Sequence, residues 1–212
     1  MATPKEMMYA KAAKTLIPAL ERRQFTAEYC ATAAEAKQAV LAQIGPEDTV
    51  GWGGSLTMQQ LGIADALHAR GQKCFDRDIA PTKEEAQEAM RLSHWADVFL
   101  MSANAVSRDG CLVNMDGSGN RVSSLICGPK KVVVAVSMNK VCTTVEDAIE
   151  RVRHVAAPMN AQRFAGDSPC RRTGQCFDCV SPDCICANLV VTRLSRIPGR
   201  IHVILIGEEL GM

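Results

Sequence analysis

Hydrophobic and polar positions alternate along the chain in blocks whose lengths suit strands and helices in turn. Three blocks, at residues 48–52, 97–103 and 130–137, are largely apolar, which is typical of strands buried on both faces. Between the strand-like blocks lie helix-like stretches, such as a long helix predicted from Thr144 to about residue 163. This alternation predicts an α/β fold whose mostly parallel sheet carries helices on both faces. The three apolar strands should be central in that sheet.

Local signals predict further elements. Residues 32–35 and 82–85 each read Thr-x-x-Glu, a capping-box pattern, so a helix should start after each threonine. An amphipathic helix is predicted for residues 7–23, although Pro18 should kink or divide it. Short strands are expected at residues 25–30, 73–76, 189–194 and 200–206, and a hairpin at 108–114.

The pattern contains no internal repeat, low-complexity tract or linker, so residues 1–212 are expected to form a single domain. One segment, residues 168–187, departs from the alternation because it is rich in cysteine and in turn-forming residues. We therefore expect one α/β domain with a cysteine-rich excursion near its C-terminal end.

Charge and composition exclude several classes of partner. Lys and Arg number 24 against 23 Asp and Glu, and aromatic residues make up only 4% of the chain. Without a concentrated basic field or a supply of stacking rings, neither a nucleic acid nor a membrane surface is an expected partner. No apolar stretch has the length of a secretory signal or a membrane span. We expect a cytoplasmic protein whose ten cysteines are reduced.

Five cysteines are crowded between Cys170 and Cys186. Cys176 and Cys179 are spaced as C-x2-C, which lets a tight turn direct two thiolates at one centre. So many soft ligands in polar, turn-rich sequence predict a metal or iron–sulfur centre, with a disulfide as the alternative. The other five cysteines have apolar neighbours and are interpreted as small core residues: Cys30, Cys74, Cys111, Cys127 and Cys142.

The spacing of the cysteines favours an iron–sulfur cluster over zinc. Structural zinc sites usually combine two closely spaced cysteine pairs, whereas this segment has one such pair and outer cysteines at irregular distances. That arrangement is commoner for a four-iron cluster (4Fe-4S). We expect this cluster as the cofactor and keep zinc as the alternative.

Two glycine-rich loops, Gly51-Trp-Gly-Gly-Ser55 and Asp116-Gly-Ser-Gly-Asn-Arg121, each follow a predicted strand and precede a predicted helix. Unpaired N–H groups at such turns favour a negative ligand, and strands of an open α/β sheet share one crevice at their carboxyl ends. We expect both loops to border a pocket for a small carboxylate or phosphate. A tight turn without a ligand is the alternative for the first loop. The expected ligand-binding residues are Gly53, Gly54, Ser55, Asp116, Gly117, Ser118, Gly119, Asn120 and Arg121.

Arg121 would grip the anion through two hydrogen bonds. Its replacement by Ala should then weaken anion binding by about 1.5–3 kcal/mol with little loss of fold. The alternative is that Arg121 pairs with Asp116 and braces the loop. The four histidines are scattered over apparent helix and strand positions, and the sequence analysis assigns no catalytic residue.

Six segments carry a family resemblance. Three of them are Val50-Gly-Trp-Gly-Gly-Ser-Leu-Thr57, Asp97-Val-Phe-Leu-Met-Ser-Ala-Asn-Ala-Val106 and Asp109-Gly-Cys-Leu-Val-Asn-Met-Asp-Gly-Ser-Gly-Asn-Arg121. The others are Gly128-Pro-Lys-Lys131, Asn139-Lys140 and Ala157-Pro-Met-Asn160. Together they resemble the LUD (lactate-utilisation) domain, over nearly the whole chain and most specifically in its middle third.

The resemblance implies a set of metal ligands. The chain resembles most closely those stand-alone members of the family that carry a Cys-x5-Cys-x2-Cys-x6-Cys tail. The cysteines that would fill this pattern are Cys170, Cys176, Cys179 and Cys186. Cys184 is then an extra cysteine outside the ligand set.

The resemblance also implies a fold similar to that of ribose-phosphate isomerase and the CoA transferases, with a ligand pocket at the strand ends. Asn104, which we expect on the floor of that pocket, stands where related sugar-phosphate isomerases have an acidic residue. An amide hydrogen-bonds but cannot serve as a general base. The resemblance therefore indicates where a ligand lies and not which reaction occurs.

Two functions remain open. The first is a redox or electron-relay accessory protein in the oxidation of lactate or a similar small organic acid, with an iron–sulfur centre, a small anionic ligand and a redox partner protein. The second is an isomerase- or transferase-type enzyme or ligand-binding module in which zinc is only structural. A brown colour after anaerobic purification favours the first, and a colourless zinc-loaded protein the second. A homo-oligomer is compatible with either.

Overall fold

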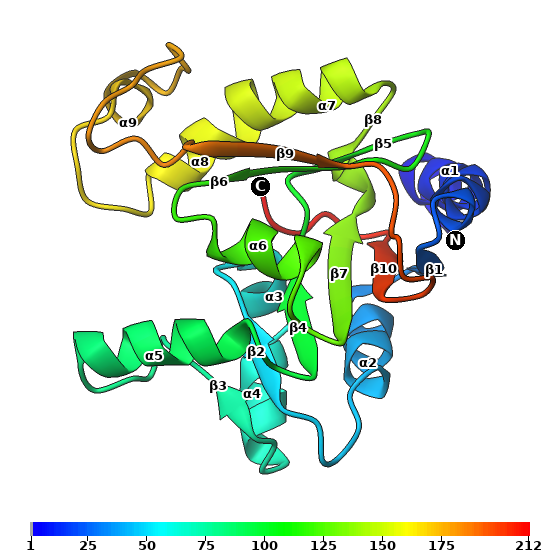
Figure 1. Ribbon diagram of the computed structural model, residues 1–212. Coiled ribbons are helices and arrows are strands. Elements are labelled where there is room, and N and C mark those ends of the chain that lie inside the picture. Colours follow the sequence, from blue (N-terminus) through cyan, green and yellow to red (C-terminus); the bar gives the residue numbers. More distant parts are fainter. Residues whose placement is uncertain (1) are drawn as a thin grey trace.

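A six-stranded sheet forms the centre of the computed structural model, which describes residues 2–212 (Figure 1). All neighbouring strands in it run parallel, which confirms the predicted α/β class. The three strands predicted to be central are all internal to the sheet and buried. In spatial order the strands are β1 (Thr26–Cys30), β10 (Ile201–Ile206), β7 (Lys131–Ser137), β4 (Val98–Met101), β2 (Val50–Trp52) and β3 (Cys74–Phe75).

A second sheet of four short strands packs over the first. It contains the predicted hairpin, whose strands β5 and β6 run antiparallel. The strand predicted at residues 189–194 also lies here and pairs antiparallel with β6. In spatial order its strands are β8 (Val141–Cys142), β5 (Ala105–Ser107), β6 (Leu112–Asp116) and β9 (Asn188–Thr192).

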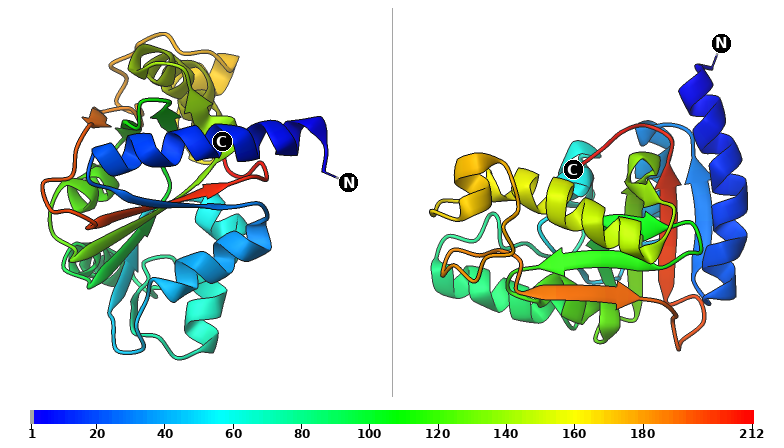
Figure 2. Two further views of the ribbon diagram at one scale, coloured as in Figure 1. Left: turned by 90° about the vertical axis from the view of Figure 1, so that its right-hand side faces the viewer. Right: turned by 90° about the horizontal axis from the view of Figure 1, so that it is seen from above.

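Helices cover both faces of the parallel sheet, as predicted: α1 lies on one side of the strands, and α2 and α4 lie on the other (Figure 2). Most of the shorter helices connect a strand to the next element. The helices are α1 (Pro4–Arg22), α2 (Ala33–Ala42), α3 (Leu56–Gln60), α4 (Ile63–Ala69), α5 (Lys83–Ser93), α6 (Asn120–Ile126), α7 (Val145–Arg151), α8 (Ala157–Ala161) and α9 (Pro169–Thr173). A 3₁₀ turn, η1 (Met138–Lys140), follows β7, and a π-helical turn, η2 (Val152–Ala156), joins α7 to α8.

The predicted helix starts are correct. The hydroxyls of Thr32, Thr82 and Thr144 each accept a hydrogen bond from the backbone N–H three residues later. The predicted long helix after Thr144 is present as the succession α7, η2 and α8, which ends at Ala161. The capping signals therefore located these helices to within a few residues.

Pro18 does not divide α1, contrary to the sequence expectation. The helix is continuous from Pro4 to Arg22, with Pro18 in its interior. Both Pro18 and Lys14, whose carbonyl loses its hydrogen-bond donor, lie on the exposed side of the helix. Water can therefore satisfy that carbonyl, while the buried side of α1 keeps its packing.

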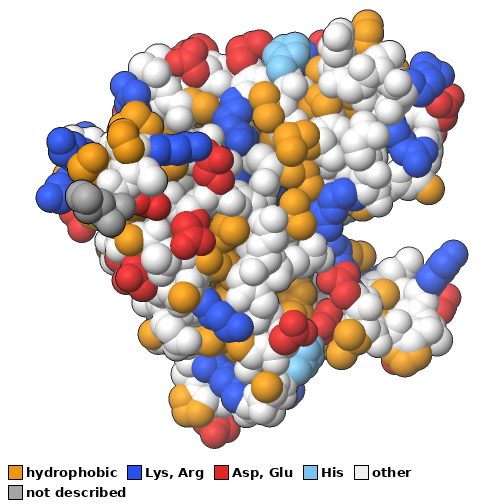
Figure 3. All heavy atoms as spheres, turned by 180° about the vertical axis from the view of Figure 1, so that it is seen from behind, with side chains coloured by type: hydrophobic (Ala, Val, Ile, Leu, Met, Phe, Trp, Pro, Cys, Tyr) orange, Lys and Arg blue, Asp and Glu red, His pale blue; other side chains and the backbone are white. Residues whose placement is uncertain are grey.

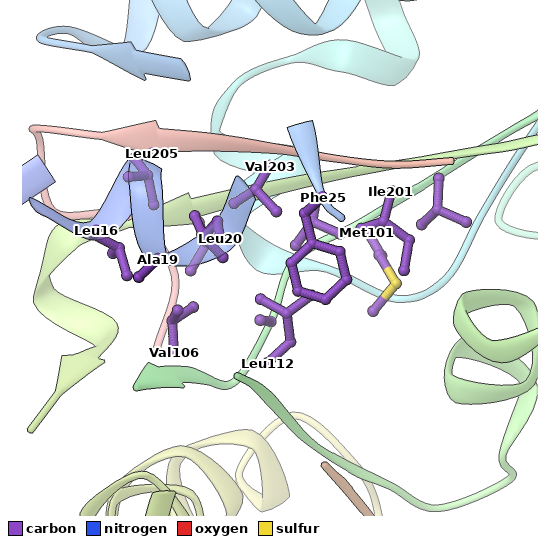
Figure 4. Close-up of a cluster of buried hydrophobic side chains, with 14 of the residues drawn as sticks. Leu16, Ala19, Leu20, Phe25, Met101, Val106, Leu112, Ile201, Val203 and Leu205 are labelled. Carbon is purple, nitrogen blue, oxygen red and sulfur yellow. The ribbon is translucent and has the colours of Figure 1, made fainter. Parts of the chain in front are cut away.

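The core is divided by the parallel sheet. One face of the sheet packs on α1, on α6 and on the second sheet, and this part of the core is drawn in Figure 4. The opposite face packs on α2, α3 and α4. A smaller cluster lies between the second sheet and the α7–η2 helix. Side chains of β7 alternate between the first two clusters, because successive strand residues point to opposite faces.

One helix stands apart from this layered arrangement. α5 projects from the side of the molecule that carries β3 and is buried only at its last residue, Ser93 (Figure 1). Within residues 2–212, none of the helices is both long and apolar enough to cross a membrane.

Candidate functional site

The carboxyl ends of four parallel strands meet at one edge of the sheet. Trp52 of β2, Met101 of β4, Ser137 of β7 and Ile206 of β10 are the last residues of these strands. The residues that follow them line a narrow recess of about 60 Å³, which we call the inner recess. This is where ligands bind in open α/β sheets. Residues from all four connections line it: Gly54 and Ser55, Ser102 to Asn104, Lys140, and Gly211 with Met212.

A wider hollow of about 370 Å³, the outer cavity, adjoins the inner recess. Gly54, Arg121, Asn160 and Arg163 line both spaces, so the two are continuous. Seen from behind, the surface is notched between the part of the molecule that carries the cysteine segment and the projecting α5, and both basic and acidic side chains lie at this notch (Figure 3). A ligand can therefore enter from the outer cavity and reach the recess.

The structure brings the two glycine-rich loops together. Ser55 and Asn104 line the inner recess. Gly54 and every residue from Asp116 to Arg121 except Gly119 line the outer cavity. Gly53 lies against the Arg121 side chain, and a Cβ on it would lie 3.1 Å from that side chain. The loops thus border one crevice with Asn104 deep in it, and ligand binding by these residues stays a prediction.

At two positions of these loops the local geometry requires glycine. A Cβ on Gly51 would lie 2.6 Å from the Cα of Ser93, so β2 and α5 approach more closely than any side chain allows. Gly119 has φ +80°, a left-handed conformation that favours glycine. These residues are therefore required for the shape of the crevice.

Arg121 is buried, and its guanidinium is saturated by protein groups. Nη1 donates to the Ser102 carbonyl and to Asn114 Oδ1, both at 3.0 Å. Nη2 donates to Asn104 Oδ1 at 3.1 Å and to the Met115 carbonyl at 2.7 Å. Nε lies 3.3 Å from Asp116 Oδ2. These contacts match the bracing alternative, whereas the predicted grip on an anion would have to break some of them.

Arg163 is an exposed cation of the site. It lines both the inner recess and the outer cavity, and its side chain is exposed. Its Nη1 donates to Asn160 Oδ1 at 3.3 Å, and no carboxylate within residues 2–212 forms an ion pair with it. Arg77, on the opposite wall, lies 3.7 Å from Asp78. An anion would thus find Arg163 available, with Asn160 as a second donor.

Lys140 is the most unusual side chain of the site. It belongs to η1, directly after the central strand β7, and is only 3% exposed. Its Nζ donates to the hydroxyls of Thr57 at 2.9 Å and Ser102 at 3.2 Å. Burial, together with the positive charges of Arg151 and Arg121, lowers the pKa of Lys140 to about 7. Near neutral pH a substantial fraction of this amine is therefore uncharged.

All five clustered cysteines line a third space, of about 70 Å³, which we call the cysteine cavity. The Cys170 sulfur lies 3.4 Å from the Ser168 hydroxyl, and burial raises the pKa of the Cys186 thiol to about 12. Within residues 2–212, however, no three His, Cys, Asp or Glu side chains are arranged to hold one metal ion. The predicted ligands Cys170, Cys176, Cys179 and Cys186 thus share a cavity with Cys184, and metal binding stays a prediction.

The cysteine cavity adjoins the outer cavity. Met115 and Ile185 line both spaces, so their side chains form a common wall. The short helix α8 also contributes to both, through Ala157 and Pro158 on the thiol side and through neighbouring Asn160 on the other. The two candidate sites predicted from separate parts of the sequence are therefore neighbours in space.

The isolated cysteines match the core interpretation only in part. Cys30 and Cys111 are buried, and Cys74 and Cys142 are half-buried. Cys127 is exposed, contrary to expectation, because it lies just after the C-terminal end of α6, beyond the helix residues that pack inward. Each histidine has a polar neighbour outside the crevice: Asp76 for His68, Ser124 for His94, Glu150 for His154 and Glu28 for His202.

The sequence prediction missed Lys140, Thr57, Ser102 and Arg163 as site residues. Two of them had a readable signal, because Lys140 and Ser102 directly follow strongly apolar strands, at the end where an α/β sheet binds its ligand. Arg163 offered none, since it follows α8 and reaches the site only through the packing of that helix.

Fold and site together define an α/β protein with a ligand crevice at the carboxyl ends of a parallel sheet and a thiol-lined cavity beside it. The chain belongs to the LUD domain family, because the model of this family matches residues 13–206. A comparison with curated proteins found no match.

Among solved structures, the chain is similar to a DUF162 family protein from Deinococcus radiodurans, with a TM-score of 0.54 and 13% identity over 93% of this chain and 98% of that one. This likeness supports the fold. Two others have TM-scores of 0.34. A ribose 5-phosphate isomerase from Plasmodium falciparum has 19% identity over 51% of each chain. The eIF2B delta of Chaetomium thermophilum has 13% identity over 63% of this chain and 52% of that one.

Proposed function

We propose that this protein is a redox or electron-relay accessory in the oxidation of lactate or a similar small organic acid. Membership of the LUD domain family supports a role associated with lactate utilisation. The observation that carries the redox part is the common wall of Met115 and Ile185 between the thiol-lined cavity and the outer cavity. A redox centre and an organic acid would then lie on the two sides of one wall. Oxidation of a 2-hydroxy acid releases two electrons and two protons, so a two-electron acceptor supplied by the redox partner protein would take them first, and the centre would relay the electrons one at a time.

The outer cavity would hold the anionic end of the ligand. Arg163 lacks a carboxylate partner and would form charge-assisted hydrogen bonds to a carboxylate or phosphate. Asn160 adds a neutral donor beside it. The acidic side chains of this cavity, Asp78 and Asp116, already lie beside Arg77 and Arg121, so they repel an incoming anion less than free carboxylates would.

The cysteine cavity would hold a 4Fe-4S cluster on Cys170, Cys176, Cys179 and Cys186. Its donors are soft thiols, the ligands that such a cluster requires, and all of them line one space. Residues 175–187 contain no helix or strand, so this segment can draw the thiols together when the metal is loaded. The cluster would supply one-electron transfer, and the chain would position an organic acid next to it and pass electrons to a redox partner protein.

Anaerobic purification tests the cluster. We expect a brown protein with a broad absorption shoulder and about four iron atoms per chain. Cys179→Ser should lose most of this iron, whereas Cys127→Ser, at an exposed cysteine outside the cavity, should keep it. A colourless wild type that carries one zinc ion would contradict the redox role. It would favour the alternative, an isomerase- or transferase-type protein with a structural zinc.

Calorimetry tests the anion site. Arg163→Gln should weaken the binding of L-lactate or inorganic phosphate by about 1.5–3 kcal/mol, the usual contribution of a charged hydrogen bond. Arg22→Gln is the matched control, because Arg22 is exposed in the last turn of α1, remote from the outer cavity. Equal affinities in the wild type and in Arg163→Gln would remove this arginine from the site.

A further inference from the structure

The inner recess ends on a buried primary amine that lacks a carboxylate partner. Within residues 2–212, Lys140 forms no ion pair, and its hydrogen-bond partners are the hydroxyls of Thr57 and Ser102. The nearby charged groups on the packed elements are the cations Arg121 and Arg151, which oppose protonation. Burying an amine without a counter-ion is costly, so a purely structural role would be met better by an uncharged side chain.

The surroundings of this amine suit a reaction with a carbonyl group. The recess is about 60 Å³, which admits only a short end of a ligand, while the continuous outer cavity offers Arg163 to an anionic end. The hydroxyls of Thr57 and Ser102 can pass protons to and from an attacked oxygen. The backbone at Gly211 packs against Lys140 Nζ and the Thr57 hydroxyl, so a side chain at position 211 would clash with both groups. The backbone around Gly211 therefore closes one side of the recess.

We propose that Lys140 is a catalytic nucleophile that forms an imine with the aldehyde or ketone carbon of a small anionic carbonyl compound. This inference rests on the anion site proposed above and not on the iron–sulfur cluster. In the step, a bond forms between Nζ and the carbonyl carbon, and the bond from that carbon to oxygen breaks. The oxygen leaves as water with the two protons of the neutral amine. The lowered pKa of Lys140 supports this role, because the neutral amine is the nucleophile.

Reductive trapping on the full chain tests the proposal. The protein is incubated near neutral pH with glyoxylate or with glycolaldehyde phosphate, each together with sodium cyanoborohydride, which reduces an imine to a stable secondary amine. The adduct adds the mass of the ligand less one oxygen atom, and peptide mapping locates it. We expect one adduct per chain, on Lys140, and the two ligands distinguish a carboxylate from a phosphate site. Adducts spread over exposed lysines, with Lys140 unmodified, would overturn the proposal.

Two lysine variants test whether trapping requires the amine of Lys140. Lys140→Met should reduce trapping at this site at least about tenfold. Lys131→Met is the control, because Lys131 is half-buried on β7 and donates to the Gln43 carbonyl away from the recess, so trapping should persist. Circular dichroism verifies the fold of both variants. If Lys140→Met misfolds, peptide mapping of the adduct on the wild type still identifies the lysine that reacted. Equal labelling of folded Lys140→Met and wild type would contradict the nucleophile role.

Calorimetry with glycolate and inorganic phosphate, which have no carbonyl group to attack, distinguishes the two proposals. If the wild type binds these anions but gives no adduct, the proposal that Lys140 is a nucleophile is wrong and the proposed anion site stands. If the wild type shows neither binding nor adduct, both proposals are wrong.

Discussion

Arg121 and Lys140 are both buried cations of one crevice, yet their surroundings differ. The guanidinium of Arg121 has five acceptors, among them the carboxylate of Asp116. The ammonium of Lys140 has two hydroxyl partners. A saturated, charge-paired arginine stabilises the loops around it, whereas a lysine without a carboxylate remains chemically available.

Arg121→Ala should therefore destabilise the protein, by about 3–5 kcal/mol, because it leaves the buried Asp116 carboxylate unpaired. Urea denaturation of the variant and the wild type measures this loss. The exposed Arg22→Ala is the control, with little expected change. If Arg121→Ala kept its stability and lost only anion affinity, the grip predicted from the sequence would be correct and the bracing role would not.

Lys140 should make stability depend on pH. Its pKa is lowered from the ordinary 10.5 to about 7 in the folded state, so between these values the unfolded chain binds more protons. The unfolding free energy of the wild type should therefore rise from pH 7 to pH 10.5, relative to Lys140→Met, by on the order of 4–5 kcal/mol. Denaturation of both proteins across this range tests the prediction. Parallel profiles would show that the amine is not perturbed.

The sequence predicted Arg121 as a site residue and did not predict Lys140. Arg121 stood in a recognisable loop, but its burial depends on acceptors from two other segments, the β4–β5 connection at Ser102 and Asn104 and the end of strand β6 at Asn114 to Asp116. Such convergence is a property of the tertiary structure. The position of Lys140 after an apolar strand was readable, but only the packing of Thr57 and Gly211 against it shows that it is enclosed.

At the scale of elements, the long apolar strands and the capped helices were predictable. The hairpin and the strand β9 of the second sheet were also predicted, but their assembly into one sheet was not. The apolar run predicted at residues 130–137 forms β7 (Lys131–Ser137), because such a run is stable when it is buried on both faces at the centre of a sheet. β8 has two residues and β5 has three, too few for a periodic signal. The pairing of β9 with β6 joins residues more than seventy positions apart, such as Leu189 and Met115, which local patterns cannot encode.

Gly51 sets how closely α5 approaches β2. A Cβ at this position would lie 2.6 Å from the Ser93 backbone, so Gly51→Ala should force α5 away and destabilise the protein by about 1–3 kcal/mol. Thermal unfolding measures the change. Gly71→Ala is the control, because a Cβ there meets no atom within 4 Å and only its positive φ of 70° opposes the substitution, at about 1 kcal/mol. A smaller loss for Gly51→Ala than for Gly71→Ala would contradict this account.

At the scale of the whole molecule, the two sheets bring distant parts of the chain to one place. The crevice draws residues from four strand ends of the parallel sheet. The cysteine segment returns through β9 to the edge of the second sheet, and this pairing places the thiols beside the outer cavity. The sequence predicted both sites singly. The adjacency of the cysteine cavity and the outer cavity follows from the β6–β9 pairing.

The position of β10 has a consequence for the order in which the protein can fold. β10 lies between β1 and β7 and pairs with both, so β1 has no neighbour in the sheet until residue 206 has been synthesised. Until then, β1 is not joined to the rest of the parallel sheet. A chain that stops at residue 199 should therefore not fold, whereas one that stops at residue 207 should. Circular dichroism and gel filtration of the two would decide this. A folded shorter chain would show that the nascent N-terminal segment does not depend on the last strand.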